Sequence, residues 1–231
     1  MVYEVVIPLL FGVVLALGHH MSDKIKLRNP NHRNKMLSFT AGVSISYLFL
    51  FLFPEMYGRT EIMSKTLFIF VLLGFSMFHL IEKHAYKQKS IEKCRKELKE
   101  IHSASFFMYH FIIGILLVNL TNLGLIEGLL LFFPIFFHTV FSVTSLTEIH
   151  DHIKIRGMLK NVLAVSTLLG VVVAFFLPLT PGIISILLGF VVGALLYVII
   201  RDTLPSNNAG DPRYFISGIA SYIVLLALVS L

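Results

Sequence analysis

Charged residues are scarce in this chain of 231 residues. Asp, Glu, Lys and Arg together make up 14% of the sequence, whereas hydrophobic residues make up 56%. A soluble domain carries about 25% charged residues, so this chain has roughly half the usual share. The high apolar content excludes an intrinsically disordered protein. The low charge excludes a typical water-soluble enzyme, which could not cover so much apolar side chain. A multi-pass membrane protein remains.

Cysteine is almost absent as well. Cys94 is the only one in the chain, so neither an internal disulfide nor a CxxC metal site can form. It lies in a Lys-rich segment, and we expect it to be a free cytoplasmic thiol. The net charge is +6, but the basic residues lie between apolar runs and do not form one patch on a folded domain. Nucleic acid is therefore not an expected partner.

Long apolar runs fill most of the chain. The hydrocarbon core of a bilayer is ~30 Å thick, and a helix needs about 20 apolar residues to cross it. Runs of this length without period-two alternation predict helices and not the strands of a barrel. The sequence therefore predicts an all-α bundle of eight transmembrane helices in a single domain, residues 1–231. The expected spans are residues 3–18, 36–57, 65–83, 104–122, 125–147, 158–178, 182–203 and 213–231.

The basic residues lie unevenly along these spans. Seventeen of the 19 Lys and Arg residues follow the first, third, fifth or seventh span, and only Arg59 and Lys65 fall on the other side. Because Lys and Arg collect in cytoplasmic loops, we expect both termini to be extracytoplasmic, in a plasma or inner membrane. The one long hydrophilic segment, residues 85–102, has apolar residues at three- and four-residue spacing, which predicts an amphipathic helix in a cytoplasmic loop. A helix resting on anionic lipid and a regulatory or metal-sensing loop are both open interpretations.

Two histidines lie deep in the predicted membrane region, where no acidic residue occurs. His110 and His138 are equally far from the turn at residues 121–125 that joins their spans. We therefore expect them to face each other at one depth, roughly 20 Å from the outer surface at 1.5 Å per residue. Imidazole binds zinc, copper, iron and nickel, and Ser142 follows one turn after His138. A metal site of these three residues is one interpretation, and hydrogen bonding between helices is the other.

Further metal-capable side chains lie near the ends of spans. Two of them share one face of the third span, three residues apart, and four lie within five residues at the inner end of the fifth. A site for metal entry or release and a solvated helix end are both open there, as they are for two consecutive histidines that close the first span. The secondary candidates are His79, Glu82, Glu148, His150, Asp151 and His152, and the histidines of the first span are His19 and His20.

Two stretches carry a resemblance to a known family. The second span runs Ser38-Phe-Thr-Ala-Gly-Val and ends in Phe51-Leu-Phe-Pro-Glu55, and the seventh runs Gly193-Ala-Leu-Leu-Tyr-Val-Ile-Ile-Arg-Asp-Thr-Leu-Pro205. With eight spans, outside termini and the longest loop after the third span, the chain resembles the ZIP family of divalent-metal transporters. The resemblance implies a ZIP-like fold, a zinc-like divalent cation as substrate and no tightly bound cofactor. The implied partners are the lipid bilayer and a divalent metal ion, with a homodimer as an open alternative.

Several of the family's metal-ligand positions hold other residues here. Tyr109 and Ile113 stand where the resemblance implies a His and an acid on the fourth span. On the fifth span His138 is kept, but Thr139 and Ser142 replace an acid and a second His. Neutral imidazoles and a hydroxyl would neutralise a divalent cation poorly. Three functions stay open: transport of a divalent metal or another small solute, a non-transporting membrane scaffold or sensor, and an intramembrane zinc hydrolase. We expect a protein that is not an enzyme.

Overall fold

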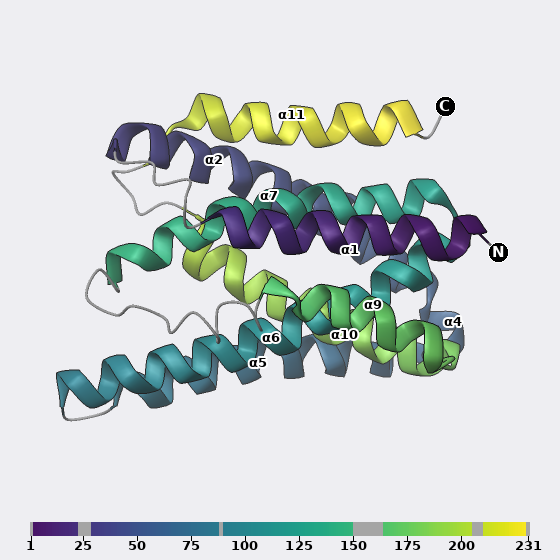
Figure 1. Ribbon diagram of the computed structural model, residues 1–231, viewed down its shortest axis with the longest axis horizontal. Helices are drawn as coiled ribbons and strands as arrows, with labels where there is room; N and C mark the ends of the chain where they lie inside the picture. Colours follow the sequence, from purple (N-terminus) through teal and green to yellow (C-terminus); the bar gives the residue numbers. More distant parts are fainter. Residues whose placement is uncertain (1, 23–28, 88–89, 150–163, 205–209, 230–231) are drawn as a thin grey trace.

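Helices form the described part of the chain. The computed structural model describes residues 2–22, 29–87, 90–149, 164–204 and 210–229, and no strand occurs in these residues (Figure 1). Two π-helical turns, η1 (Leu48–Leu52) and η3 (Ile199–Thr203), continue α2 and α10, and a 3-10 turn, η2, covers Ser64–Thr66. The α-helices are α1 (Val2–Ser22), α2 (Pro30–Tyr47), α3 (Phe53–Gly58), α4 (Thr60–Met63), α5 (Leu67–Tyr86), α6 (Ile91–Leu123), α7 (Leu125–Ile149), α9 (Ser166–Phe176), α10 (Pro181–Val198) and α11 (Pro212–Val229).

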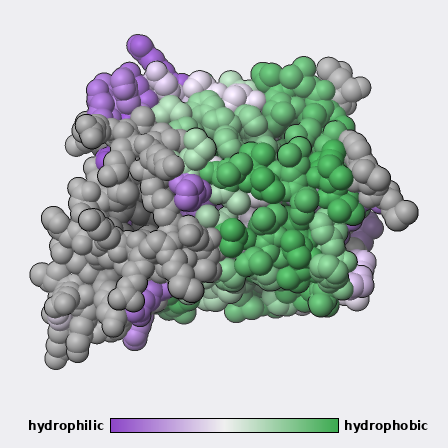
Figure 2. All heavy atoms as spheres, in the orientation of Figure 1, coloured by the Kyte–Doolittle hydropathy of each residue, from purple (hydrophilic) through white to green (hydrophobic). Residues whose placement is uncertain are grey.

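Six helical segments of the described residues are long and apolar enough to cross a membrane. They are Glu4–Met21, Asn31–Gly58, Ser64–His84, Ser103–Leu123, Pro181–Arg201 and Pro212–Val229. Two shorter apolar stretches, Leu125–Phe141 and Ser166–Phe176, lie in α7 and α9. Hydrophobic side chains cover most of the described surface on the face shown in Figure 2. The chain is therefore a multi-pass membrane protein.

The all-helical class predicted from the sequence is confirmed. A helix lies at each of the eight expected ranges, although residues 158–163 of the sixth range lie outside the described residues. Both termini lie at the same end of the bundle, near α4 (Figure 1). A chain whose termini share one end must cross the bundle an even number of times.

The segment at residues 85–102 differs from the expected loop. Its helix is not separate, because α6 begins at Ile91 and runs without a break for 33 residues to Leu123. At 1.5 Å per residue such a helix is about 50 Å long, well beyond the ~30 Å of a hydrocarbon core. The hydrophilic residues therefore extend the fourth expected span at the end far from the termini (Figure 1).

The contacts between helices divide them into two groups. α1 contacts α6, α7 and α9, and α6 also contacts α7 and α9; we call these four helices the α1 group. α2 packs along α11, and α5 packs along α10. The two pairs are joined because η3 contacts α2, and α10 contacts η1 and α3, so we call these four helices the α2 group. The two groups meet where α2, α11 and η3 contact α7 and where α6 contacts α5 and α10.

Pairs of glycines bring three pairs of helices into backbone contact. At each of these glycines an added Cβ would lie 1.9–2.2 Å from a carbonyl oxygen of the partner helix, so only glycine fits. Small residues allow this close approach between membrane helices, where van der Waals packing is a main source of association. The pairs are Gly42 and Gly218 between α2 and α11, Gly74 and Gly193 between α5 and α10, and Gly114 and Gly170 between α6 and α9.

Candidate functional site

His110 is buried inside the α1 group. Its side chain is 2% exposed, and its ring stacks on Phe106 with 4.0 Å between the centroids. Thr167 Oγ1, on α9, lies 3.3 Å from His110 Nδ1, within hydrogen-bond distance. The His19 ring, on α1, is also close, at 6.5 Å between centroids. His110 therefore faces α1 and α9, and His19 belongs to the same buried cluster.

His138, on α7, is buried beside α6. Its side chain is 4% exposed, and its ring lies edge-on to Tyr109 with 6.4 Å between the centroids. The turn between α6 and α7 is the single residue Gly124, as the depth argument requires. Consecutive residues of a helix point about 100° apart, and the ring of Tyr109, the residue before His110, lies beside His138.

A complete metal site is not found in the part of the chain that the structure describes. No three His, Cys, Asp or Glu side chains there lie close enough together to hold a metal ion. Several sequence candidates fall outside that part: the side chains of Ser142 and Glu148, and the whole of His150, Asp151 and His152. Two imidazoles do not by themselves make a zinc site, which usually has at least three protein ligands.

Glu82 is engaged in a polar network that joins α5 to η3. Its carboxylate pairs with Arg201 at 2.8 Å and accepts a hydrogen bond from the Tyr197 hydroxyl. Arg201 also donates to the Tyr86 hydroxyl at 2.9 Å. His79 is exposed and its ring lies edge-on to that of Tyr197, at 5.8 Å. Both residues thus support the packing of α5 on α10, inside the α2 group.

The structure reveals a set of buried hydroxyls that the sequence analysis did not single out. Each is at most 3% exposed, and none has a hydrogen-bond partner among the described residues. We call them the hydroxyl set: Thr40, Ser44 and Tyr47 on α2, Tyr109 on α6, and Thr139 on α7. The spacing of four and three residues on α2, which places three hydroxyls on one helical face, was the signal available in the sequence.

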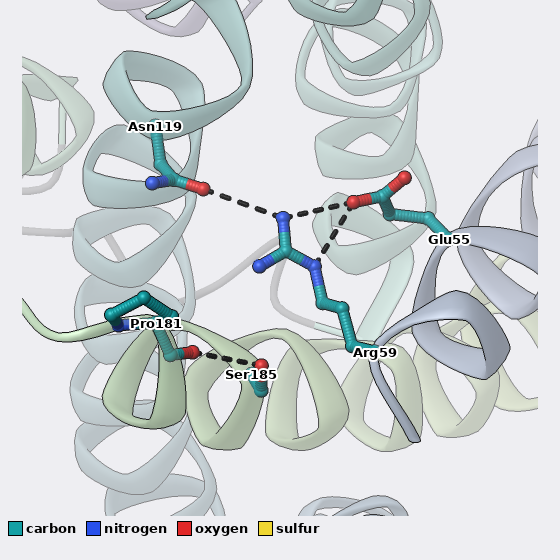
Figure 3. A network of polar contacts seen from close by, with 5 residues as sticks. All are labelled: Glu55, Arg59, Asn119, Pro181 and Ser185. Carbon is teal, nitrogen blue, oxygen red and sulfur yellow. Dashed lines mark hydrogen bonds and ion pairs between the residues drawn. The ribbon is translucent and has the colours of Figure 1, made fainter. Parts of the chain in front are cut away.

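An apolar layer and an ion pair lie between the hydroxyl set and the end of the bundle that holds the termini. Arg59 pairs with Glu55 at 2.8 Å and donates to Asn119 Oδ1 at 3.5 Å, so the continuation of α2 is tied to α6 (Figure 3). Figure 3 also shows the start of α10 beside this network, where the Ser185 hydroxyl donates to Pro181 O. Apolar side chains near this ion pair, on η1, α3 and α6, are at most 1% exposed: Leu48, Leu52, Met56, Leu116, Leu117 and Leu120.

Comparison with known proteins did not identify a family for this chain. No model of a protein family matches the chain, and no curated protein matches it either. The function is therefore argued from the arrangement of the helices and the chemistry of the buried residues.

Proposed function

We propose that the protein is a ZIP-like transporter that carries a small solute between its two helix groups. The observation that carries the proposal is the position of the hydroxyl set. Its members lie on α2, in one group, and on α6 and α7, in the other, deep within helices that are apolar enough to cross a membrane. Polar residues inside a membrane are costly and mark solute pathways.

The mechanism follows from the two groups. In many transporters one helical bundle rocks against another around a site near the midplane of the bilayer. Each glycine pair holds together two helices of the same group. Arg59, which is paired with Glu55 in the α2 group, instead contacts Asn119 on α6, in the α1 group. Movement at that boundary would expose the hydroxyl set to one side of the membrane and then to the other.

The proposal includes eight spans, counting α7 and α9, and termini outside the cytoplasm. The shared end of the two termini (Figure 1) and the grouping of 17 of the 19 Lys and Arg residues on the other side support it. A zinc-like divalent cation is the first substrate to test, because the resemblance implies it and His138 occupies one of the family's ligand positions. No catalytic function is part of the proposal.

A non-transporting scaffold or sensor is the second candidate. It is favoured by Ile113 and Thr139, which stand where the resemblance implies acids, and by Tyr109, which stands where it implies a His and contacts His138. A scaffold would keep the hydroxyl set closed to both sides of the membrane.

Accessibility of the hydroxyl set separates the two candidates. Cys94 is replaced by Ser, Ser44 by Cys, and the protein is reconstituted in liposomes. A membrane-impermeant thiol reagent is then applied from each side. We expect labelling of Ser44→Cys from both sides, and little labelling of Leu117→Cys in the apolar layer. Labelling from neither side would overturn transport and favour the scaffold.

Zinc flux in the same liposomes tests the first substrate. We expect His138→Ala to abolish any flux that the wild-type protein supports, and the exposed His79→Ala to leave it unchanged. An absence of zinc flux with the site open from both sides would exclude zinc and retain transport of another solute.

A further inference from the structure

We propose that the hydroxyl set binds a small uncharged solute that both donates and accepts hydrogen bonds, of the class of short polyols and ureas. The inference rests on the proposed transport function and names the class of solute. It contrasts with a charged substrate, for which the same residues are poorly suited.

The first argument is the unsatisfied chemistry of the set. Buried polar groups in proteins almost always have a hydrogen-bond partner, because an unmade hydrogen bond in a buried place is costly. Here five hydroxyls lack one among the described residues, and Thr40 and Tyr47 are 0% exposed. By contrast, the buried hydroxyl of Thr121 donates to Leu117 O within its own helix. A solute with several donors and acceptors would satisfy neighbouring members of the set.

The second argument is that the elements carrying the hydroxyl set are neighbours. α2, α7 and η3 contact one another, and the three hydroxyls on α2 share one face. The Tyr47 ring lies 6.0 Å from the ring of Tyr222 on α11, and the Tyr109 ring lies 6.4 Å from that of His138. The set is therefore bounded by aromatic rings, which give an uncharged solute apolar contact beside its hydrogen bonds.

Two irregular turns border the same region. η1 begins directly after Tyr47, and η3 contacts both α2 and α7. π-helical turns inside α-helices frequently occur at functional sites. Their presence at this junction, and not at the glycine crossings, points to the same location as the unsatisfied hydroxyls.

The third argument is the absence of charge. No Asp, Glu, Lys or Arg occurs in residues 36–54, 103–126 or 128–147, which carry the whole set. Glu55, two turns beyond Tyr47, is already paired with Arg59. Moving an ion from water into an apolar region is far costlier than moving a neutral polar group, unless an opposite charge compensates it. Serine, threonine and tyrosine hydroxyls supply donors and acceptors but no compensating charge.

Swelling of proteoliposomes, followed by stopped-flow light scattering, tests the proposal with glycerol and urea as probes. We expect the wild-type protein to raise the rate of entry of at least one probe severalfold above that of protein-free liposomes. The double variant Ser44→Ala, Tyr47→Phe should reduce the added rate about tenfold, because it removes two hydroxyls and almost no volume. Ser185→Ala is the matched control, since that buried hydroxyl is satisfied by Pro181 O in its own helix, and it should leave the rate unchanged.

The outcomes separate this inference from the proposed function. Entry of both probes at the rate of protein-free liposomes, with Ser44→Cys labelled from both sides, would overturn the uncharged class and leave transport standing. Zinc flux that depends on His138 while neither probe enters would also overturn it, in favour of a cation. Labelling of Ser44→Cys from neither side would overturn transport itself. A double variant that elutes as a single peak in size-exclusion chromatography, like the wild type, shows that lost entry is not lost folding.

Discussion

Arg59 is the residue at which the two helix groups share a charged contact. Its side chain is 12% exposed, and it reaches Glu55 four residues earlier and Asn119 on α6. An exposed ion pair contributes little to stability, but this one is largely enclosed. Loss of Arg59 would therefore leave the Glu55 carboxylate with few other hydrogen-bond donors. A single side chain thus contributes both to the stability of this end and to its closure.

Replacing Arg59 with Gln should lower the free energy of unfolding by about 1–2 kcal/mol, because a half-buried acceptor loses its charged donor. Glu55 keeps 25% of its side chain exposed, which holds the effect below that of a fully buried carboxylate. The helical circular dichroism signal followed against temperature in detergent measures it. The exposed Arg213→Gln should change stability by less than about 0.5 kcal/mol. A wild-type melting temperature for Arg59→Gln would show that the ion pair has no structural role.

Some properties of single residues could be predicted from the sequence, and others could not. Counting from the turn gives an expected common depth for His110 and His138, because the rise per residue is constant in a helix. The rotation of α6 was not predictable, since it depends on packing against α9 at Gly114 and Gly170. The ring of Tyr109 lies beside His138, and that of the next residue, His110, lies near His19. The buried partners of an imidazole therefore have to come from the structure.

At the scale of elements, the apolar runs predicted where helices lie, and glycines decide which helices pair. Hydropathy is a local property of the sequence, so the helix ranges could be predicted from it. Pairing is not local: Gly74 and Gly193 are far apart in the chain, and their fit becomes visible only when α5 and α10 are brought together. For the same reason the separation into an α1 group and an α2 group was not part of the sequence prediction.

Gly193→Ala should destabilise the protein by about 3 kcal/mol, the upper end of the usual cost of overpacking. Its Cβ would lie 1.9 Å from Val71 O, a backbone atom that cannot move aside as a side chain can. Gly182→Ala is the matched control on the same helix, because nothing lies within 4 Å of its added Cβ. Thermal unfolding in detergent compares the two. Equal melting temperatures would mean that α5 and α10 are not in backbone contact.

At the scale of the whole molecule, the buried hydroxyl set and the contacts that close one end of the bundle correspond to one conformational state of a protein built from two helix groups. The apolar layer and the contact from Arg59 to Asn119 lie between the hydroxyl set and the end that holds the termini. The network of Glu82 and Arg201 lies within the α2 group and would be unaffected by movement between groups. The two polar networks therefore have different roles in the proposed transport: the first resists opening, and the second keeps one group rigid.

A cross-link across the boundary should stop transport, and one within a group should not. In a Cys94→Ser background, the pair Arg59→Cys and Asn119→Cys is bridged with a short bis-methanethiosulfonate reagent that a reductant removes. Because the bridge prevents the groups from separating, we expect solute entry into proteoliposomes to fall to that of protein-free liposomes and to return on reduction. The pair Glu82→Cys and Arg201→Cys, bridged by the same reagent inside the α2 group, should keep at least half of the unbridged rate. Full entry through the first bridged protein would mean that the groups do not move apart at this end, and that any solute path lies elsewhere.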